Sequence, residues 1–374
     1  MLAKPVSSAC DLRCEYCYYA GKDRLLGVEE ARMPLDVLDR YTRQLLAMHG
    51  RDAVVEFAWH GGEPTSAGLP FFHEAVRLQE LYGKGRKILN TLQTNGTLLD
   101  DELCHFFKEK GFLLGVSVDG PRDLHDVYRK GADGRGSFDG TMRGIELLRR
   151  HGVPFNTLTA VHDVNSRKAL DVYRFLRELT DHMQFLPVVE TLPAGHGQDG
   201  ALAMPPGIHA TDDARSVAPF SVSPGQWGAF LCDILEEHMA RGAGREHVQI
   251  IDVTLGILGG APSSLCVHDP LCGHSGCVEA NGDVYACDRY AFPSYRLGNI
   301  METDMGALME GNRAFGMRKT YALPDDCFDC PHVELCFGGC PKDRLQGGRN
   351  YLCEGYRMFF DAIRERRWRA RRGR

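Results

Sequence analysis

Apolar and polar residues alternate along the first half of the chain with two different periods. Runs that are almost wholly apolar end in glycine or a polar residue, as buried parallel strands do. They cover residues 53–60, 87–96, 112–120, 153–161 and 182–190. Before and between these runs, apolar residues recur every three or four positions, which predicts amphipathic helices. These helical stretches cover residues 34–50, 100–111, 137–152 and 165–180.

Strand-like and helix-like segments in alternation predict βα units with parallel strands. With a short strand expected at the extreme N-terminus, the pattern gives about six such units. We therefore expect an α/β protein built on a partial (β/α)6 barrel of the TIM type. Ligands of such folds gather at the carboxyl ends of the strands.

The pattern changes after residue 190. Residues 191–224 are rich in Gly, Pro, Ala and Ser, which predicts a long surface loop. A helix is predicted to begin near residue 226, and nine of the fourteen cysteines lie from Cys266 onward. We therefore expect two domains, a barrel with its trailing loop over residues 1–224 and a metal-stapled domain over residues 225–374.

Composition narrows the class of protein further. The chain has 374 residues, 43% hydrophobic and 25% charged, as ordinary globular proteins do. No apolar run approaches the roughly 18 residues of a membrane-spanning helix, and no secretory signal precedes Cys10. We expect a cytoplasmic protein that binds neither membrane nor nucleic acid, because the net charge is −6. The arginine-rich residues 363–374 are interpreted as a solvated terminus that frays.

Three cysteines near the N-terminus follow the spacing Cys10-x3-Cys14-x2-Cys17. Thiols at such short spacings in a reducing compartment indicate metal binding rather than disulfides. Three thiolates can hold one cubane iron–sulfur cluster and leave its fourth iron open for chemistry. Structural zinc is the alternative, but it requires four ligands, commonly in paired knuckles.

With the aromatic residues around Cys17, this loop resembles that of the radical S-adenosylmethionine enzymes. The resemblance implies that S-adenosylmethionine binds the open iron. It also implies that Gly61-Gly62-Glu63-Pro64 approaches the methionine amino group, with Glu63 accepting its hydrogen bonds. Ser117 and Arg129 are candidates for the cofactor's carboxylate, since a guanidinium suits a carboxylate. The full set of predicted cofactor contacts is Tyr16, Gly62, Glu63, Gln93, Ser117, Arg129 and Val189.

The C-terminal cysteines resemble, in spacing and order, the SPASM extension of peptide-modifying radical enzymes. The resemblance implies two auxiliary clusters, so that the chain would carry three 4Fe–4S clusters in all. One auxiliary cluster would be held by Cys266, Cys272, Cys287 and Cys340, and the other by Cys327, Cys330, Cys336 and Cys353. Cys104 and Cys232 are predicted to be small buried helix residues. Cys277 could compete with Cys272 as a ligand.

Over nearly its whole length the chain resembles the anaerobic sulfatase-maturating enzymes. The resemblance rests on the stretches CDLRCEYCYYA, HGGEPTSAG, TLQTNGTLL, VSVDGP, GDVYACDRY and RLGNI. It implies conversion of a cysteine, or in some members a serine, in a sulfatase Cys-x-Pro-x-Arg segment to Cα-formylglycine. In that chemistry a 5′-deoxyadenosyl radical removes a hydrogen from the target Cβ.

The same resemblance assigns further roles and partners. Asp288, directly after Cys287, would be the catalytic base that takes the substrate's thiol proton. Tyr19 would lie near the substrate cysteine and could orient its side chain or that base. The implied partners are an unfolded or nascent sulfatase polypeptide and a reductant such as flavodoxin or ferredoxin.

Two other functions remain open at this point. One is a SPASM-type maturase that forms a thioether or carbon–carbon crosslink in a ribosomal peptide. The other is an electron-transfer iron–sulfur protein or a zinc-stabilised scaffold. The three-cysteine loop favours an enzyme over an electron carrier, because an electron carrier does not need an open iron.

Overall fold

A computed structural model describes residues 1–28, 32–193, 215–241 and 246–372. The chain folds into two compact units, each assembled from separate stretches of the sequence. The first unit comprises Met1–Ser117, His125–Asn156 and Gly273–Phe315. The second comprises Val118–Leu124, Thr157–Cys272 and Gly316–Arg374. Among the described residues, no helix is long and apolar enough to cross a membrane.

The first unit contains a sheet whose strands follow the order β12-β11-β10-β1-β2-β3-β4. Neighbours from β10 through β1 to β4 are parallel, while β10, β11 and β12 are antiparallel. The strands are β1 (Leu2–Ala3), β2 (Val55–Trp59), β3 (Ile88–Thr94), β4 (Leu113–Ser117), β10 (Cys277–Val278), β11 (Asp283–Tyr285) and β12 (Arg296–Asn299).

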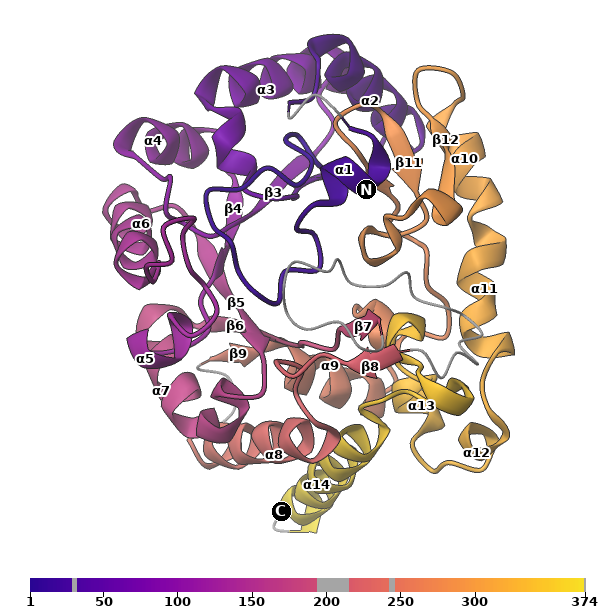
Figure 1. Ribbon diagram of the computed structural model, residues 1–374. Coiled ribbons are helices and arrows are strands. Elements are labelled where there is room, and N and C mark those ends of the chain that lie inside the picture. Colours follow the sequence, from indigo (N-terminus) through magenta and orange to yellow (C-terminus); the bar gives the residue numbers. More distant parts are fainter. Residues whose placement is uncertain (29–31, 194–214, 242–245, 373–374) are drawn as a thin grey trace. The chain divides into compact units, whose positions relative to one another are not determined.

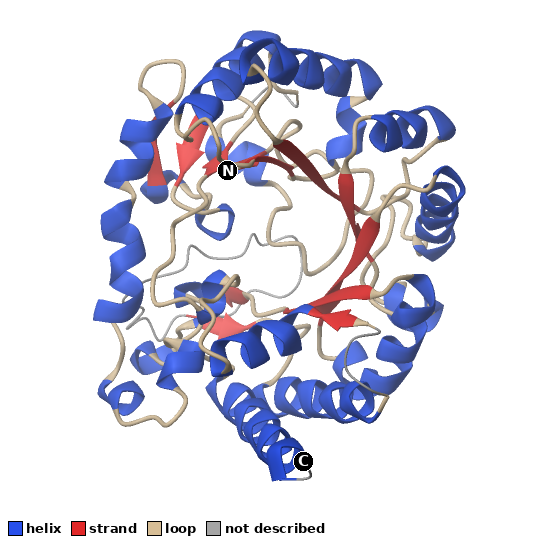
Figure 2. Cartoon of the chain, turned by 180° about the vertical axis from the view of Figure 1, so that it is seen from behind, coloured by secondary structure: helices blue, strands red, loops and turns tan. Residues whose placement is uncertain are grey.

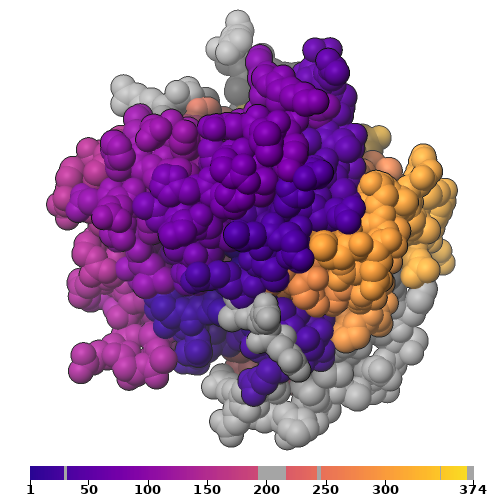
Figure 3. All heavy atoms as spheres, turned by 90° about the horizontal axis from the view of Figure 1, so that it is seen from above, coloured from indigo at the N-terminus to yellow at the C-terminus, as the bar shows by residue number. Residues whose placement is uncertain are grey.

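The pairing of β1 with β10 joins the two ends of the first unit's sequence. Leu2 lies opposite Cys277, and Ala3 lies opposite Val278. Figure 3 shows residues near 300, in orange, packed directly against the early residues in indigo and violet. Part of the sequence that carries the C-terminal cysteines therefore extends the sheet that begins at the N-terminus.

Amphipathic helices cover the first unit's sheet. Figure 1 shows α2, α3, α4 and α6 along one face of β2, β3 and β4. At the centre of this layer the rings of Tyr41, Phe57, Trp59 and Phe72 pack mostly edge to face. The helices are α1 (Lys22–Leu26), α2 (Leu35–Ala47), α3 (Leu69–Gly83), α4 (Asp101–Glu109), α6 (Phe138–His151) and α10 (Met305–Gly311).

The second unit has its own parallel strands, β5, β6 and β9, with helices beside them (Figure 2). Its long helix α8 begins with a capping box, in which Ser223 and Gln226 satisfy each other's backbone N–H groups. Its strands are β5 (Phe155–Val161), β6 (His182–Pro187), β7 (Thr191–Pro193), β8 (Arg215–Val217) and β9 (His247–Val248). Its helices are α7 (Ala169–Leu179), α8 (Pro224–Ala240), α9 (Gln249–Leu258), α12 (Asp325–Phe328), α13 (Val333–Cys336) and α14 (Cys353–Arg372). Two further helices, α5 (Arg122–His125) and α11 (Arg313–Tyr321), cross the unit boundaries.

Two expectations from the sequence need amendment. Within the predicted loop 191–224, β7 and β8 form an antiparallel pair, and residues 194–214 lie outside the described residues. The arginine-rich end does not fray at its beginning, because α14 continues to Arg372. There Arg364 donates to the Pro331 carbonyl at 3.0 Å, and Arg366 pairs with Glu236 of α8.

Candidate active site

The loop between β1 and α1 carries Cys10, Cys14 and Cys17. The N–H of Leu12 donates to the Cys10 Sγ at 3.3 Å, and the N–H of Cys17 donates to the Cys14 carbonyl at 3.0 Å. The backbone therefore winds closely around the first thiols. Burial raises the pKa of the Cys10 thiol. A metal cation bound there would favour the thiolate, so these residues fit an iron–sulfur cluster.

Polar groups from two other segments hold this loop in place. Asn95 Nδ2, just after β3, donates to Asp11 Oδ1 at 2.8 Å and lies 3.8 Å from the Cys10 Sγ. The N–H of Arg13 donates to the Lys130 carbonyl at 2.6 Å. The carboxyl end of a parallel strand thus supports the cysteine loop, as the fold class predicts.

The two glycines of the Gly61-Gly62-Glu63-Pro64 motif bring the end of β2 against the residues before Cys10. The N–H of Gly62 donates to the Ser7 carbonyl, and that of Glu63 donates to the Ala9 carbonyl, both at 2.8 Å. A Cβ on Gly62 would lie 2.0 Å from the Ala9 carbonyl oxygen. Only glycine permits this approach. The motif therefore has a structural role in addition to its predicted contact with the cofactor.

Glu63 is fully buried, and its carboxylate joins the ends of β2 and β3. It accepts the N–H of Asn95 at 2.7 Å, the Thr94 hydroxyl at 2.8 Å, and the N–H and hydroxyl of Thr65 at 3.0 and 2.6 Å. Burial raises the pKa of this carboxyl group, and the four hydrogen bonds oppose that rise. Among the described residues, Oε2 accepts only the bond from Asn95. It therefore retains capacity for a ligand's amino group.

The other predicted cofactor contacts of the first unit fall into two pairs. Gln93 Nε2 donates to the Ser117 Oγ at 3.0 Å, across the ends of β3 and β4. The guanidinium of Arg129 is 7% exposed and lies 5.6 Å from the centroid of the Tyr16 ring, a cation–π contact. The structure thus brings each of these residues to a partner that the sequence also singled out.

Asp288 begins a short turn directly after Cys287 and is held by two groups from the N-terminal region. The Tyr18 hydroxyl donates to its Oδ2 at 2.6 Å, and the ammonium of Lys4 lies 3.9 Å from the same oxygen. The Lys4 side chain is fully buried, and that of Asp288 is 16% exposed. The other carboxylate oxygen, Oδ1, lies 3.5 Å from the Cys287 Sγ.

The surroundings keep Asp288 ionised. Burial by itself would raise its pKa, but the charges of Lys4 and Arg289 and the hydrogen bond from Tyr18 lower the pKa well below the ordinary value. His60 is the neutral member of this group. Burial, with Lys4 in addition, lowers the pKa of His60 to about 3, and its Nδ1 accepts the N–H of Gly61 at 2.8 Å.

Tyr19 lies next to this group but faces another carboxylate. Its buried hydroxyl donates to Glu279, and the Lys4 ammonium lies 4.0 Å from the centroid of its ring. The residue that orients the predicted base Asp288 is therefore Tyr18, in place of Tyr19. Contact of Tyr19 with the substrate stays a prediction.

The cysteines of the second unit form two sets that affect each other's ionisation. Burial raises the pKa of Cys272 to about 11 and of Cys340 to about 12, and the neighbouring Cys266 raises both further. In the same way burial, and then Cys353, raises the pKa of Cys327 and Cys336.

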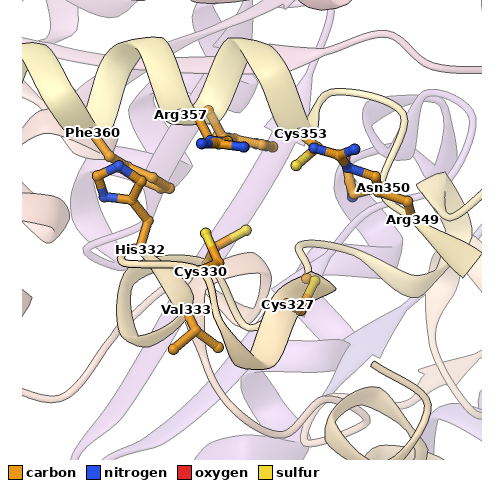
Figure 4. A pocket seen from close by; sticks show the side chains of 12 residues that line it. Cys327, Cys330, His332, Val333, Arg349, Asn350, Cys353, Arg357 and Phe360 are labelled. Carbon is orange, nitrogen blue, oxygen red and sulfur yellow. The ribbon is translucent and has the colours of Figure 1, made fainter. Parts of the chain in front are cut away.

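The second of these sets lines a cavity beside α14. Figure 4 shows the sulfurs of Cys327, Cys330 and Cys353 around one space, with Arg349 and Arg357 at its border. Cys336 completes the four thiols. Four cysteines around one cavity fit a four-thiolate iron–sulfur cluster. No three His, Cys, Asp or Glu side chains of the described chain are grouped as a single metal ion would need.

The remaining residues from the sequence analysis lie as follows. Val189 is buried after β6, and its carbonyl accepts the Lys342 ammonium, which also pairs with Glu190 at 3.0 Å. Cys277 is wholly buried within β10, where burial raises its pKa to about 12. Of the two helix cysteines, Cys104 is buried as predicted and Cys232 is only partly buried.

Comparison with known proteins gives this arrangement a family. The pattern of the radical SAM superfamily matches residues 5–176, and the SPASM iron–sulfur cluster-binding domain matches residues 272–331. A serine-type anaerobic sulfatase-maturating enzyme of Bacteroides thetaiotaomicron is 40% identical over 373 residues, which cover 97% of this chain and 89% of that protein. The chain belongs to the anaerobic sulfatase-maturating enzymes.

Both types of anaerobic sulfatase-maturating enzyme resemble this chain. A cysteine-type member from Clostridium perfringens strain 13 is 31% identical over 372 residues, which cover 96% of this chain and 95% of that protein. The solved structure "Native anSMEcpe with bound AdoMet and Cp18Cys peptide" matches with a TM-score of 0.83 at 31% identity, over 98% of this chain and 97% of that one. The predicted TIM-like α/β fold with a SPASM domain is thereby confirmed, and S-adenosylmethionine and iron–sulfur clusters are the cofactors.

Three residues around the predicted base of this sulfatase-maturating enzyme were not identified from the sequence. They are Lys4, Tyr18 and His60. Lys4 does leave a signal, since it is a charged residue in an otherwise apolar start that belongs to the first strand. Tyr18 was noticed as an aromatic neighbour of Cys17, but nothing in the sequence connects it with Asp288, 270 residues away.

Proposed function

We propose that this sulfatase-maturating enzyme oxidises the Cβ of a cysteine, or of a serine, in a sulfatase Cys-x-Pro-x-Arg segment, giving Cα-formylglycine. The observation that carries the proposal is Asp288, a buried carboxylate kept ionised directly after the predicted cluster ligand Cys287. The same end of the sheet carries the three-cysteine loop. A peptide present in the related solved structure supports a polypeptide substrate.

The cofactors and the chain divide the chemistry between them. When bound, S-adenosylmethionine and the clusters supply the hydrogen-abstracting radical and an acceptor for one electron. We propose three 4Fe–4S clusters held by the eleven cysteines named above. The S-adenosylmethionine contacts that we propose are Tyr16, Gly62, Glu63, Gln93, Ser117, Arg129 and Val189.

Within this division Asp288 receives the proton of the substrate's thiol. Tyr18 and Lys4 both bind Oδ2 and fix the orientation of the carboxylate. Oδ1 is the oxygen that we assign to the substrate, because a metal-bound Cys287 thiolate would have no proton to donate to it. A carboxylate with so low a pKa is a weak base. We therefore expect loss of the proton to accompany loss of the electron from the substrate carbon.

We further propose that the substrate is an unfolded or nascent sulfatase in the cytoplasm. A folded sulfatase would have to expose its target segment, and a cysteine with all flanking residues must reach Asp288. A small electron-transfer protein such as flavodoxin or ferredoxin would supply the reducing equivalents.

Mass spectrometry of two model peptides tests the proposal. Peptides with Cys-x-Pro-x-Arg and Ser-x-Pro-x-Arg are incubated without oxygen with the protein, S-adenosylmethionine and a reductant. We expect an aldehyde, trapped by a hydrazine, on one or both target residues, and none with Cys14→Ala. An intramolecular crosslink without aldehyde would reject formylglycine formation and favour the crosslinking maturase.

A further inference from the structure

Helix α11 packs closely against the loop that joins Cys266 to Cys272. A Cβ on Gly316 would lie 2.1 Å from the Cys272 carbonyl oxygen, and the N–H of Cys272 donates to the Gly316 carbonyl at 3.4 Å. One turn later, the Thr320 hydroxyl donates to the Pro270 carbonyl. The helix and the loop are therefore in contact over the whole length of the loop.

Lys319 of α11 directs its charge into this loop. Its side chain is wholly buried, and its ammonium donates to the carbonyls of Cys266 at 2.6 Å, Val267 at 3.2 Å and Asp269. An ammonium has three protons to donate, so all three have acceptors. The three acceptors lie within four consecutive residues that begin at the predicted cluster ligand Cys266.

The charge of Lys319 is not neutralised by a carboxylate. In the part of the chain that the structure describes, Lys319 forms no ion pair with Asp or Glu, and burying an ammonium without a counter-ion is unfavourable. The ionisable groups that act on it are cysteines. Burial lowers the pKa of Lys319, while Cys340, Cys266, Cys272 and Cys336 raise it.

Hydrogen bonds alone do not account for a lysine at this position. A neutral donor could satisfy these carbonyls without the cost of burying a charge. A fixed positive charge is favourable when an anion lies beside it. A cubane held by four thiolates is such an anion, and nearby charges and hydrogen bonds set its reduction potential.

We propose that Lys319 is the counter-charge of the auxiliary cluster to which Cys266, Cys272 and Cys340 contribute. It holds the ligand loop in place and makes this cluster easier to reduce, which suits an acceptor for the electron that leaves the substrate. Lys319 is a positioning residue, because it touches the ligand loop and not the substrate. The proposal rests on the proposed cluster set, but its test does not require formylglycine formation.

The test measures the reduction potentials of the auxiliary clusters. Cys10, Cys14 and Cys17 are replaced by alanine, so that only the auxiliary clusters remain, and redox titrations are followed by electron paramagnetic resonance. Lys319→Met removes charge and hydrogen bonds, Lys319→Gln keeps a neutral donor, and Lys319→Arg keeps the charge. Arg318→Met is the matched control, because Arg318 is the exposed neighbour on the same helix.

We expect one auxiliary signal to shift to lower potential in both neutral variants, by about tenfold in the reduction equilibrium, which is about 59 mV for one electron. The arginine variant and Arg318→Met should keep the original potential. Loss of about four iron atoms in Lys319→Met, with recovery in Lys319→Arg, would also support the proposal, because it shows the ligand loop failing without the charge.

Unchanged potentials in neutral variants with full iron content would overturn the proposal. Failure of both neutral variants to fold would also overturn it, since Lys319 would then serve the stability of the chain. Absence of any auxiliary cluster from the triple-alanine protein is a separate result. It would reject the proposed cluster set, whatever the role of Lys319.

Discussion

The carboxylate of Asp288 combines burial with a pKa held low by Lys4 and Arg289 and by the hydrogen bond from Tyr18. Asp288→Asn removes the proton acceptor but keeps the shape. We expect cleavage of S-adenosylmethionine to persist while aldehyde formation falls by about 100-fold or more, the range for losing a general base. Quantifying 5′-deoxyadenosine and peptide aldehyde in the same reaction separates the two effects. Normal aldehyde yield would remove Asp288 from the proposed role, and Asp36→Asn on α2 serves as the surface control.

The two adjacent tyrosines should differ in their effects. Tyr18→Phe deletes the hydrogen bond to Asp288, and a bond to a charged group contributes about 1.5–3 kcal/mol, so kcat should fall by roughly tenfold or more. Tyr19→Phe deletes a bond to Glu279 instead and should change KM for the peptide more than kcat. Steady-state kinetics of both variants decide the matter. A kcat loss confined to Tyr19→Phe would show that Tyr19 orients the base.

His60 makes the stability of the protein depend on pH. The folded protein protonates this ring at a pKa of about 3, whereas the unfolded chain does so near the ordinary value of 6.5. Between these values the unfolded state binds more protons, so the stability present above pH 6.5 is lost as the pH falls. The loss should be up to about 1.4 kcal/mol per pH unit.

Anaerobic urea unfolding between pH 7 and pH 4 measures this loss in the wild type and in His60→Gln. The variant should unfold with a flatter pH dependence, because glutamine does not titrate. Equal slopes in the two proteins would show that His60 is already free to protonate in the folded state.

At this scale the sequence predicted the residues whose spacing or strand-end position has a local signature. The cysteines, Glu63, Gln93 and Ser117 belong to this class, and the structure places the last two in contact. Partners brought together by tertiary folding leave no local trace. Tyr18 reaches Asp288 and Lys319 reaches Cys266 only because distant strands or helices pack against each other.

At the scale of elements, hydrophobic periodicity was sufficient for the long segments. The strand predicted over residues 87–96 is β3, and the helix predicted over residues 137–152 is α6. The pairing of β1 with β10 was not predictable, because each strand has two residues and a period cannot be recognised over so short a run. The basic end of α14 was misread because its charge suggested solvent, whereas Arg364 and Arg366 bind other elements.

The close approach of the Gly61-Gly62-Glu63-Pro64 turn to the cysteine loop gives a prediction about a backbone contact. Gly62→Ala places a Cβ 2.0 Å from the Ala9 carbonyl oxygen, so the loop before Cys10 must move. We expect loss of roughly 2 kcal/mol or more of stability and of about four iron atoms. Iron analysis and anaerobic unfolding check this. The control is Gly50→Ala, where a Cβ meets nothing within 4 Å, and equal iron in both variants would contradict the account.

At the scale of the whole molecule, the two compact units do not follow the order of the chain. Residues Gly273–Phe315 belong with the N-terminal strands and bring Asp288 to Lys4 and Tyr18. The sequence could predict a barrel and a cysteine-rich region, because each has its own pattern. It could not predict that the base would be supplied to the first unit from the cysteine-rich region.

The central claim is that a hydrogen of the target residue's Cβ is transferred to 5′-deoxyadenosine before the aldehyde forms. A Cys-x-Pro-x-Arg peptide deuterated at that Cβ, incubated without oxygen with S-adenosylmethionine and reductant, tests it most directly. Mass spectrometry should find deuterium in 5′-deoxyadenosine and an aldehyde on the same peptide. Aldehyde formation with 5′-deoxyadenosine free of deuterium, or labelled 5′-deoxyadenosine beside a crosslinked peptide, would contradict the account.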